Sequence, residues 1–385
     1  MNMGMFAELA RKVGSEIEKL RNKAPENGVN SPEVSSEASG IEEAVTTPRN
    51  ATASSIYRCA PAVAQLSLPP EVREIQEDME RDYNRSVETL KFYDKLPNPS
   101  DPSKLISAPL LQEDPEKPGK YYYVADYDGR NEMITDPADA TKRIPNPDAV
   151  NFVGRKFTMP TCTEVLSWLT VDQVKLYNDM KAKGLEPKLQ LSPIALNIRT
   201  MGRRIDAKRA ELGINKSDTY VWDGIKDNEL VYEADKFEAI EGGRKLKITG
   251  GKSKSQWIKE NNGWTVDIVA TKEDLDEDSD KKSESGVEFT SAEKMEKYMA
   301  DSRKRGYRGL GYETYLTAQM DALRRGKPLE KLYYTALPES SLNIQDLIAD
   351  GAWRDDDVYL ARYAADDQDD GFRFRRSVRV RRLEI

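Results

Sequence analysis

The sequence contains no histidine. Histidine is the side chain that most often acts as a general base near neutral pH, and its imidazole is the commonest metal ligand. Its absence excludes the usual Ser–His and Cys–His nucleophilic centres and most zinc sites. We therefore expect a protein that works by binding rather than an enzyme, with no cofactor.

Cysteine and long apolar runs are also scarce. The only cysteines are Cys59, in low-complexity sequence, and Cys162, in a predicted folded region, so no disulfide framework is expected. No run approaches the ~18 apolar residues that a membrane helix needs, and residues 1–6 lack the charged and then apolar pattern of a signal peptide. These absences predict a cytoplasmic protein, or one incorporated into a particle assembled there, without membrane insertion.

The charge balance argues against nucleic acid as a partner. Charged residues make up 33% of the 385 residues, apolar residues make up 38%, and the formal net charge is −8. Phosphate backbones are bound by basic surfaces, so an acidic chain is poorly suited to them. We interpret the basic stretches at 303–305 and in the last ten residues as solvated faces.

The N-terminal part divides into a helix and a linker. Residues 1–22 carry apolar side chains at helical spacing, namely Phe6, Leu9, Val13, Ile17 and Leu20. This amphipathic helix would dock on a partner and join the protein to a homo-oligomer or a larger assembly; the alternative is a weakly formed helix at a loose terminus. Residues 23 to about 53 hold mostly Ser, Glu, Pro, Asn and Thr, and we predict a disordered linker over 23–68.

Residues 69–150 are predicted to form a helix followed by an irregular and β segment. The helix spans 71–93 with an apolar stripe of Val72, Ile75, Met79, Tyr83, Val87 and Leu90. Proline-rich sequence over 97–118 ends it, a strand follows at 121–125, and residues 136–151 are expected to be loop because they contain three prolines.

The larger region, residues 151–385, alternates helical and strand-like patterns. Helices are expected at 162–182, 192–212, 290–305 and 312–325. The first of them begins with a capping box formed by Thr161 and Glu164. Short strands are expected at 219–222, 229–232, 245–248 and 263–269, with hairpin turns at the glycine pairs 242–243 and 250–251. A charged loop is expected at 272–286.

Three motifs of this region resemble a known family. A Gly-Ala-Trp strand at 351–353, a polar loop and a Gly-Phe-Arg strand at 371–373 are similar to the C-terminal end of the C-type-lectin fold, in the form shared by formylglycine-generating-enzyme-like domains and the variable proteins of diversity-generating retroelements. Residues 154–164 look like the Arg-Leu-Pro-Thr-x-x-Glu start of that fold's first helix, with Met159 in place of leucine. The resemblance implies an α+β fold, with a C-type-lectin-like binding domain over 151–385, flanking helices and a disordered N-terminal segment.

Alternation in the strand that follows Trp353 predicts two different faces. Val358 and Leu360 point one way and Tyr359, Ala361 and Tyr363 the other, because side chains alternate along a strand. We expect the first pair to be buried, together with Trp353, Phe372 and Phe374. Tyr359, Ala361 and Tyr363 would face solvent, where the tyrosines offer large contact area at low entropic cost.

The resemblance also implies a ligand-binding set. Randomising the adenines of an asparagine codon yields Asp, Tyr, Ala, Ser and Gly, and these residues dominate 355–371. The predicted ligand-binding residues are Asp355, Asp356, Asp357, Tyr359, Ala361, Tyr363, Asp366, Asp367, Asp369 and Asp370, and Gly371 would be diversified with them. The partner would be a protein or surface ligand. The alternative is an ordinary acidic surface loop.

Other chemistry is weakly represented. The acidic residues could bind calcium, but no Asp-x-Asp-x-Asp-Gly loop is present. Formylglycine-generating chemistry needs paired cysteines, and the Gly-Lys-Ser at 251–253 lacks the first glycine of a phosphate loop. The alternative function is a structural component of a virus or mobile element whose lectin-like end is a packing surface; a divergent enzyme ranks third.

Overall fold

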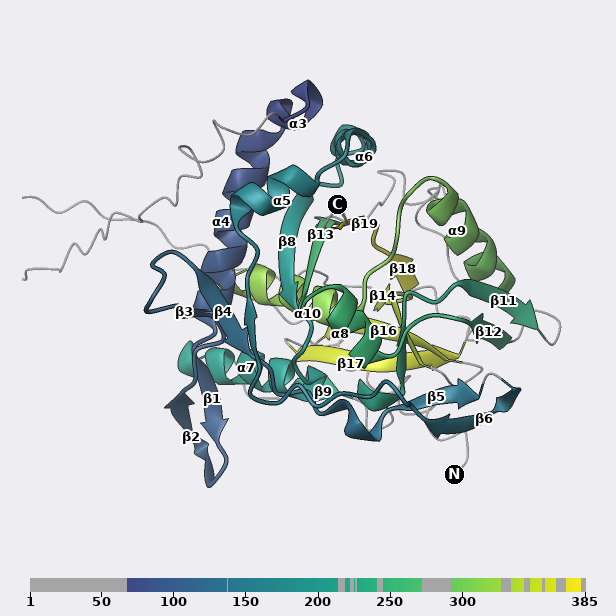
Figure 1. Cartoon of the computed structure of the whole chain (residues 1–385), viewed down its shortest axis with the longest axis horizontal. Coiled ribbons are helices and arrows are strands. Elements are labelled where there is room, and N and C mark those ends of the chain that lie inside the picture. The colour runs from purple at the N-terminus through teal and green to yellow at the C-terminus, as the bar shows by residue number, and fades with distance from the viewer. Residues whose placement is uncertain are drawn as a thin grey trace, which may run out of the picture. The chain divides into compact units, whose positions relative to one another are not determined.

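Helices and small open sheets are mixed along the described part of this computed structural model (Figure 1). The structure describes residues 68–136, 138–213, 219–221, 225, 227–240, 245–271, 292–326, 334–342, 347–354, 357–364 and 372–381. All of them belong to one unit, Ser55–Ile385. The predicted N-terminal helix lies outside these ranges, as does the predicted linker except for Leu68, which is buried in the core.

A three-stranded antiparallel sheet lies at the centre of the core. Its strand order is β19 (Ser377–Val380), β13 (Trp264–Ala270), β8 (Pro187–Pro193). Every side chain of β13 is buried, as expected for a strand that is covered on both faces. Helices α4 (Gln76–Phe92) and α10 (Tyr312–Arg324) pack against β8.

The predicted apolar stripe of the first helix is confirmed. All of its residues are buried: Val72, Ile75, Met79, Tyr83, Val87 and Leu90. A short helix, α3 (Pro70–Glu74), precedes α4, because the chain departs from helical geometry at Ile75. Polar side chains of α4 also form hydrogen bonds with the backbone of edge strand β8. Asp82 Oδ2 accepts the Leu189 N–H at 3.1 Å, and Ser86 Oγ donates to the Leu189 carbonyl at 3.3 Å.

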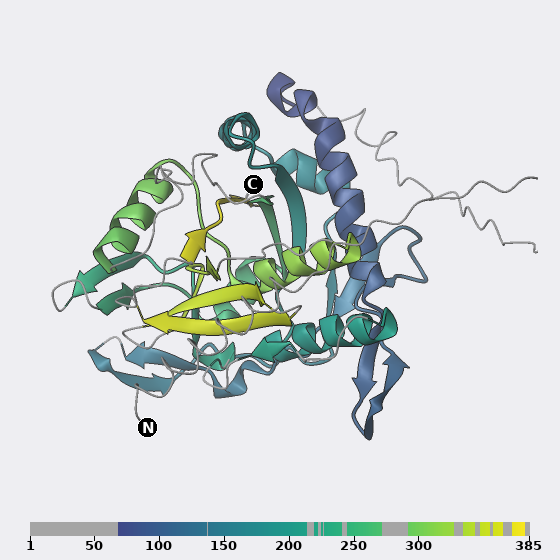
Figure 2. The ribbon, with the colours of Figure 1, turned by 180° about the vertical axis from the view of Figure 1, so that it is seen from behind.

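A five-stranded mixed sheet contains most of the C-terminal strands. Its order is β18 (Phe372–Phe374), β14 (Tyr334–Ala336), β16 (Leu347–Arg354), β17 (Asp357–Ala364), β9 (Tyr220–Val221). Strands β16 and β17 form an antiparallel hairpin, whereas β14–β18 and β17–β9 are parallel pairs. The yellow strands β16 and β17 cross the front of the view in Figure 2.

The helix predicted over 162–182 is two helices. They are α5 (Cys162–Trp168) and α6 (Val171–Ala182), separated by Leu169 and Thr170 in extended conformation. The predicted capping box of Thr161 and Glu164 is confirmed, and a second one, between Thr170 and Gln173, starts α6. The prediction missed the break because the apolar spacing continues across it.

The helix predicted over 192–212 begins later than expected. Strand β8 occupies the residues up to Pro193, and α7 (Ile198–Glu211) starts after Asn197, whose side chain accepts the Arg199 N–H. Proline disfavours continuation of a helix, and asparagine is a strong N-cap, so both signals were present in the sequence.

Two proline-containing segments form hairpins. The predicted loop at 136–151 was wrong, because β6 (Asp139–Pro145) pairs there with β5 (Met133–Asp136). In the proline-rich stretch, β1 (Lys95–Asn98) pairs with β2 (Asp101–Ser107), and this hairpin projects at the bottom of Figure 1. Both are two-stranded sheets, in which every strand is an edge that tolerates proline.

The two glycine pairs have different roles. Strands β11 (Lys236–Ile240) and β12 (Lys245–Thr249) pair antiparallel on either side of 242–243, which itself lies outside the described ranges. The pair at 250–251 does not close a hairpin: both glycines have positive φ, of 70° and 93°, and lead into the unpredicted helix α8 (Lys254–Glu260).

The remaining predicted elements are present. Helix α9 (Ala292–Lys304) precedes α10, and Gly326 has a φ of 67° after α10 ends, as a C-terminal glycine should. The remaining strands are β3 (Gln112–Glu113), β4 (Tyr121–Val124), β7 (Lys156–Thr158), β10 (Leu230–Tyr232) and β15 (Ser340–Leu342), and the short 3-10 turns are η1 (Gly129–Asn131) and η2 (Asp227–Glu229). The predicted charged loop at 272–286 lies outside the described residues.

One hydrophobic core runs from Leu68 to Val380, so residues 69–150 and 151–385 share it. None of the helices in the described ranges has the length and apolar character required to span a bilayer.

Candidate functional site

The β16–β17 hairpin holds the first part of the predicted binding surface. Its register is continuous over eight residue pairs, from Leu347 opposite Ala364 to Arg354 opposite Asp357. Val358 and Leu360 are fully buried, which confirms that part of the prediction. Strand alternation assigns positions 357, 359, 361 and 363 to the other face.

Part of that other face is covered by the chain itself. Asp350 of β16 lies directly opposite Ala361, and residues opposite one another in an antiparallel pair share a face. Only 2% of Asp350 is exposed. The centre of the hairpin is therefore covered on both faces, and open surface would have to lie toward its ends.

Several predicted site residues lie outside the described part of the chain. These are Asp355, Asp356, Asp366, Asp367, Asp369, Asp370 and the adjoining Gly371. The structure describes only the backbone of Asp357, Tyr359, Ala361, Tyr363, Trp353, Phe372 and Phe374. The hairpin thus brings positions 357–363 onto one strand, and the acidic positions after it remain predictions.

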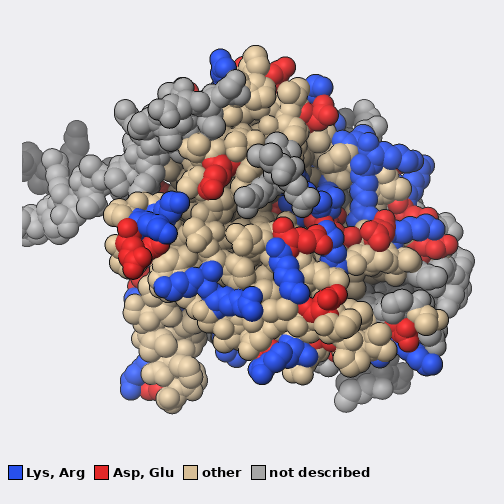
Figure 3. Space-filling model, viewed as in Figure 1, with Lys and Arg blue, Asp and Glu red and all other residues tan. Residues whose placement is uncertain are grey.

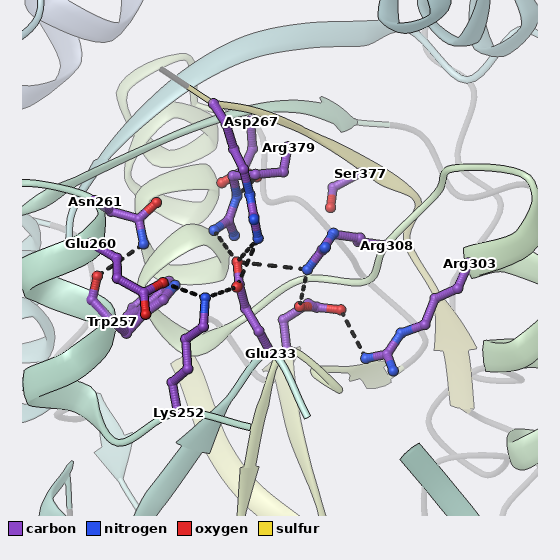
Figure 4. Close-up of polar contacts among 12 residues, drawn as sticks. Glu233, Lys252, Trp257, Glu260, Asn261, Asp267, Arg303, Arg308, Ser377 and Arg379 are labelled. Atoms are coloured by element: carbon purple, nitrogen blue, oxygen red, sulfur yellow. Dashed lines mark hydrogen bonds and ion pairs between the residues drawn. The ribbon is translucent and has the colours of Figure 1, made fainter. Parts of the chain in front are cut away.

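A second feature, which the sequence did not reveal, is a network of charged side chains centred on Glu233 (Figure 4). We call it the Glu233 cluster, and its members are Glu233, Lys252, Glu260, Asp267, Arg303, Arg308, Glu339, Arg379 and Arg381. Arg379 Nη1 lies 3.1 Å from Glu233 Oε1, and Arg381 Nη2 lies 2.7 Å from Oε2. Glu233 Oε2 also accepts from Lys252 Nζ at 3.0 Å.

Two further carboxylates extend the cluster into the protein. Arg379 Nε donates to Asp267 Oδ1 of β13 at 2.5 Å, and both side chains are almost completely buried. Glu339, only 1% exposed, lies 3.3 Å from Arg308 and 3.5 Å from Arg303. The cluster therefore ties β19 to β13, to the end of β10 and to the segment before β15.

The local backbone explains how Glu233 reaches this position. Its φ is 51°, in the left-handed region, directly after the last residue of β10. Tyr232 and Lys252 exchange two backbone hydrogen bonds of 2.9 and 2.8 Å, which bring the two chain segments together. The turn then directs the Glu233 carboxylate toward the arginines.

The charge environment holds Glu233 ionised. Burial alone would raise its pKa, but Arg379, Arg381 and the hydrogen bond from Lys252 lower the pKa to about 2. Such a carboxylate is a poor general base near neutral pH. The cluster is suited to holding strands together and not to proton transfer.

The cluster corrects our interpretation of the C-terminal basic run. We expected these arginines to be solvated, but Arg376 and Arg379 are 2% and 7% exposed; of the last ten residues' arginines that the structure describes, only Arg381 is exposed. Alternate residues of a strand share a face, so the Arg-x-Arg spacing at 379–381 could have indicated a common partner. The main partner of these two arginines, Glu233, lies about 150 residues earlier in the chain, so no local sequence pattern identifies it.

The other basic stretch is mostly solvated, as predicted. Lys304 and Arg305 are exposed, whereas Arg303 turns toward Glu339. On the face drawn in Figure 3, acidic and basic side chains are interspersed, and basic ones gather at the upper right, where Figure 1 shows α9.

Catalytic and metal sites find little support in the described residues. No group of three or more Cys, Asp or Glu residues in these ranges is placed to hold a metal ion. Cys162 is buried at the start of α5 and forms no disulfide within the described residues. A hollow of about 10 Å³ between α4, β8 and α10, lined by Arg85, Lys188 and Arg325 among others, has room for little more than a water molecule.

Comparison with family models, with curated proteins and with solved structures finds no match to this chain.

Proposed function

We propose that this protein binds a protein or surface ligand through the solvent-side positions of β17 and the acidic segment that follows it. The observation that supports the proposal is the burial of Val358 and Leu360 within a continuous hairpin register. Positions 359 and 363 then belong to the opposite face of β17, and the strand is held in place by Val358 and Leu360 without them. Binding is proposed to be non-catalytic.

The scaffold of the proposal is a C-type-lectin-like domain. The Gly-Ala-Trp segment at 351–353 belongs to β16, and Phe372 and Arg373 of the Gly-Phe-Arg motif belong to β18, so the described residues of the two C-terminal motifs lie in one five-stranded sheet. In this proposal the variable, ligand-contacting residues lie directly before β17, on alternate positions of β17 and in the chain between β17 and β18, and retroelement diversification exchanges them without altering the framework residues Val358 and Leu360.

A four-residue substitution tests the binding surface. Replacing Tyr359, Tyr363, Asp366 and Asp369 together by alanine should abolish the signals that the labelled full chain gives on an array of extracellular proteins and glycans. The melting temperature should change little, because surface substitutions usually alter the free energy of unfolding by less than about 0.5 kcal/mol each.

The matched control is Leu360→Ala, which truncates a buried side chain of the same strand. It should lower the free energy of unfolding by about 2–5 kcal/mol while leaving the array pattern of the folded fraction unchanged. If the four-residue variant unfolds, or keeps the wild-type array pattern, the proposed surface is wrong.

Diversification has a separate genetic test. A near-copy of the 3′ end of the gene, with adenines at the codons of the proposed variable residues and a reverse transcriptase gene beside it, would support it. A locus without these two features would contradict diversification and leave the binding proposal to the array experiment.

A further inference from the structure

A lysine and a glutamate are paired in the dry interior, apart from the Glu233 cluster. Lys254 is the first residue of α8 and Glu313 the second residue of α10. Lys254 Nζ lies 2.8 Å from Glu313 Oε1, and neither side chain has any exposed surface. Nζ also donates to the Leu196 carbonyl at 2.8 Å and lies 4.8 Å from the centre of the Tyr127 ring.

The two carboxylate oxygens of Glu313 have different surroundings. Oε1 accepts from Lys254 and, at 2.8 Å, from the Tyr232 hydroxyl, whose ring stacks on Trp257. Oε2 is buried and has no hydrogen-bond partner among the described residues. An ionised carboxylate with one unsatisfied oxygen is an unfavourable group to bury.

We propose that Lys254 and Glu313 condense into an intramolecular amide once the chain has folded. The Lys254 Nζ lone pair attacks the Glu313 side-chain carbonyl carbon, a C–N bond forms, and the bond from that carbon to Oε2 breaks. The ammonium group gives up two protons, which leave with Oε2 as one molecule of water. The step needs no oxidant, reductant or further reactant.

The site has the groups that this reaction requires. Transfer of one ammonium proton to the adjacent carboxylate leaves the neutral amine, which is the nucleophile of this step. The Tyr232 hydroxyl donates to Oε1, the oxygen on which negative charge develops during attack.

Two physical terms favour the product. Reacting groups held in contact behave as if present at effective molarities of about 10⁵–10⁸ M. Condensation also replaces two buried charges by one neutral amide and removes the unsatisfied oxygen as water. The product would link α8 and α10 covalently across 58 intervening residues (255–312).

Intact mass spectrometry of the denatured full chain tests the proposal. The expected mass is lower than the sequence mass by one water molecule, and a digest should contain one branched peptide joining the segments around 254 and 313. A chain of full sequence mass would overturn the proposal, because the pair would then be ionic.

Three variants make the result specific. Lys254→Arg removes the attacking amine and should restore the full mass, whereas Lys252→Arg, at a half-buried lysine nearby, should keep the water deficit. Glu313→Gln should show either the full mass or a deficit of one ammonia, since an amide side chain loses ammonia and not water. A water deficit that persists in Lys254→Arg or Glu313→Gln would place the linkage elsewhere and overturn the assignment.

Discussion

Two buried carboxylates, Glu233 and Asp82, have pKa values shifted in opposite directions. Glu233 is surrounded by cations, which outweigh burial and lower its pKa to about 2. Burial raises the pKa of Asp82, and the opposing effects of Arg85 and Lys188 are smaller. Several nearby cations stabilise the ionised form of Glu233 by more than burial destabilises it. For Asp82 the desolvation cost of ionisation exceeds the stabilisation from its neighbours.

Glu233→Gln should lower the free energy of unfolding at pH 7 by about 3–5 kcal/mol, because it removes the carboxylate that Lys252, Arg379 and Arg381 share and leaves the buried Arg379 with one carboxylate partner fewer. The folded-state pKa lies below the ordinary value of 4.5, so the stabilisation is fully present above about pH 4.5. It is lost as the pH falls toward about 2. Denaturant titrations of both proteins across this range should therefore converge at acid pH.

The control for Glu233 is Glu260→Gln. Glu260 also pairs with Lys252, but about half of its side chain is exposed, so its loss should cost no more than about 1 kcal/mol. Equal costs for the two substitutions, or a Glu233 difference that does not shrink at acid pH, would contradict the assignment.

Asp82→Asn should show the opposite pH dependence. A raised folded-state pKa means that wild-type stability is lost as the pH rises through that pKa, because the charge must form in a buried site. Asparagine keeps an oxygen for the Leu189 N–H and carries no charge. The stability of the variant relative to wild type should therefore increase between about pH 4 and pH 7, measured by denaturant unfolding. If the variant instead became less stable relative to wild type as the pH rises over this range, the raised pKa of Asp82 would be contradicted.

At the scale of elements, helical periodicity was the most informative sequence signal. The predicted stripe from Val72 to Leu90 repeats over three or more turns, so its buried face was predicted correctly. Short elements were missed: α8 has only seven residues and follows two glycines, and β5–β6 contains prolines that usually mark loops. Their formation depends on tertiary contacts that a local pattern does not contain.

Gly251→Ala tests one such contact. A Cβ there would lie 2.6 Å from Val231 Cγ1 and 2.9 Å from the Tyr232 carbonyl, at a φ of 93°. Gly119→Ala is the matched control, since its φ is 80° but a Cβ would meet nothing within 4 Å. We expect the control to cost about 1 kcal/mol and Gly251→Ala to cost at least about 1–3 kcal/mol more by thermal unfolding. Equal costs would show that backbone conformation alone explains the glycine.

The candidate site was predictable only where it depends on a local sequence pattern. Alternation within β17 is local, so the burial of Val358 and Leu360 could be predicted. The Glu233 cluster joins residues from five separate stretches of chain, and 385 residues with 67 acidic and 59 basic side chains offer too many pairings to choose among. Position in the fold, not residue type, selects its members.

At the scale of the whole molecule, the core is continuous from Leu68 onward. The sequence predicts that residues 23–68 form a linker, and Leu68, the first residue that the structure describes, is buried in the core. Limited proteolysis should therefore remove about the first 60 residues quickly and leave a fragment with the melting temperature of the full chain. Cleavage that starts within 151–385, or protection of residues 1–60, would contradict this organisation.

The contacts of α4 with strand β8 bear on aggregation as well as on folding. Asp82 and Ser86 occupy the N–H and carbonyl of Leu189, so an approaching strand from another molecule finds these pairing groups already used. Detachment of α4 would expose an apolar strand edge while the rest of the sheet persisted. Such a species would assemble edge to edge, so solubility during heating or refolding would be governed by one helix and not by global unfolding.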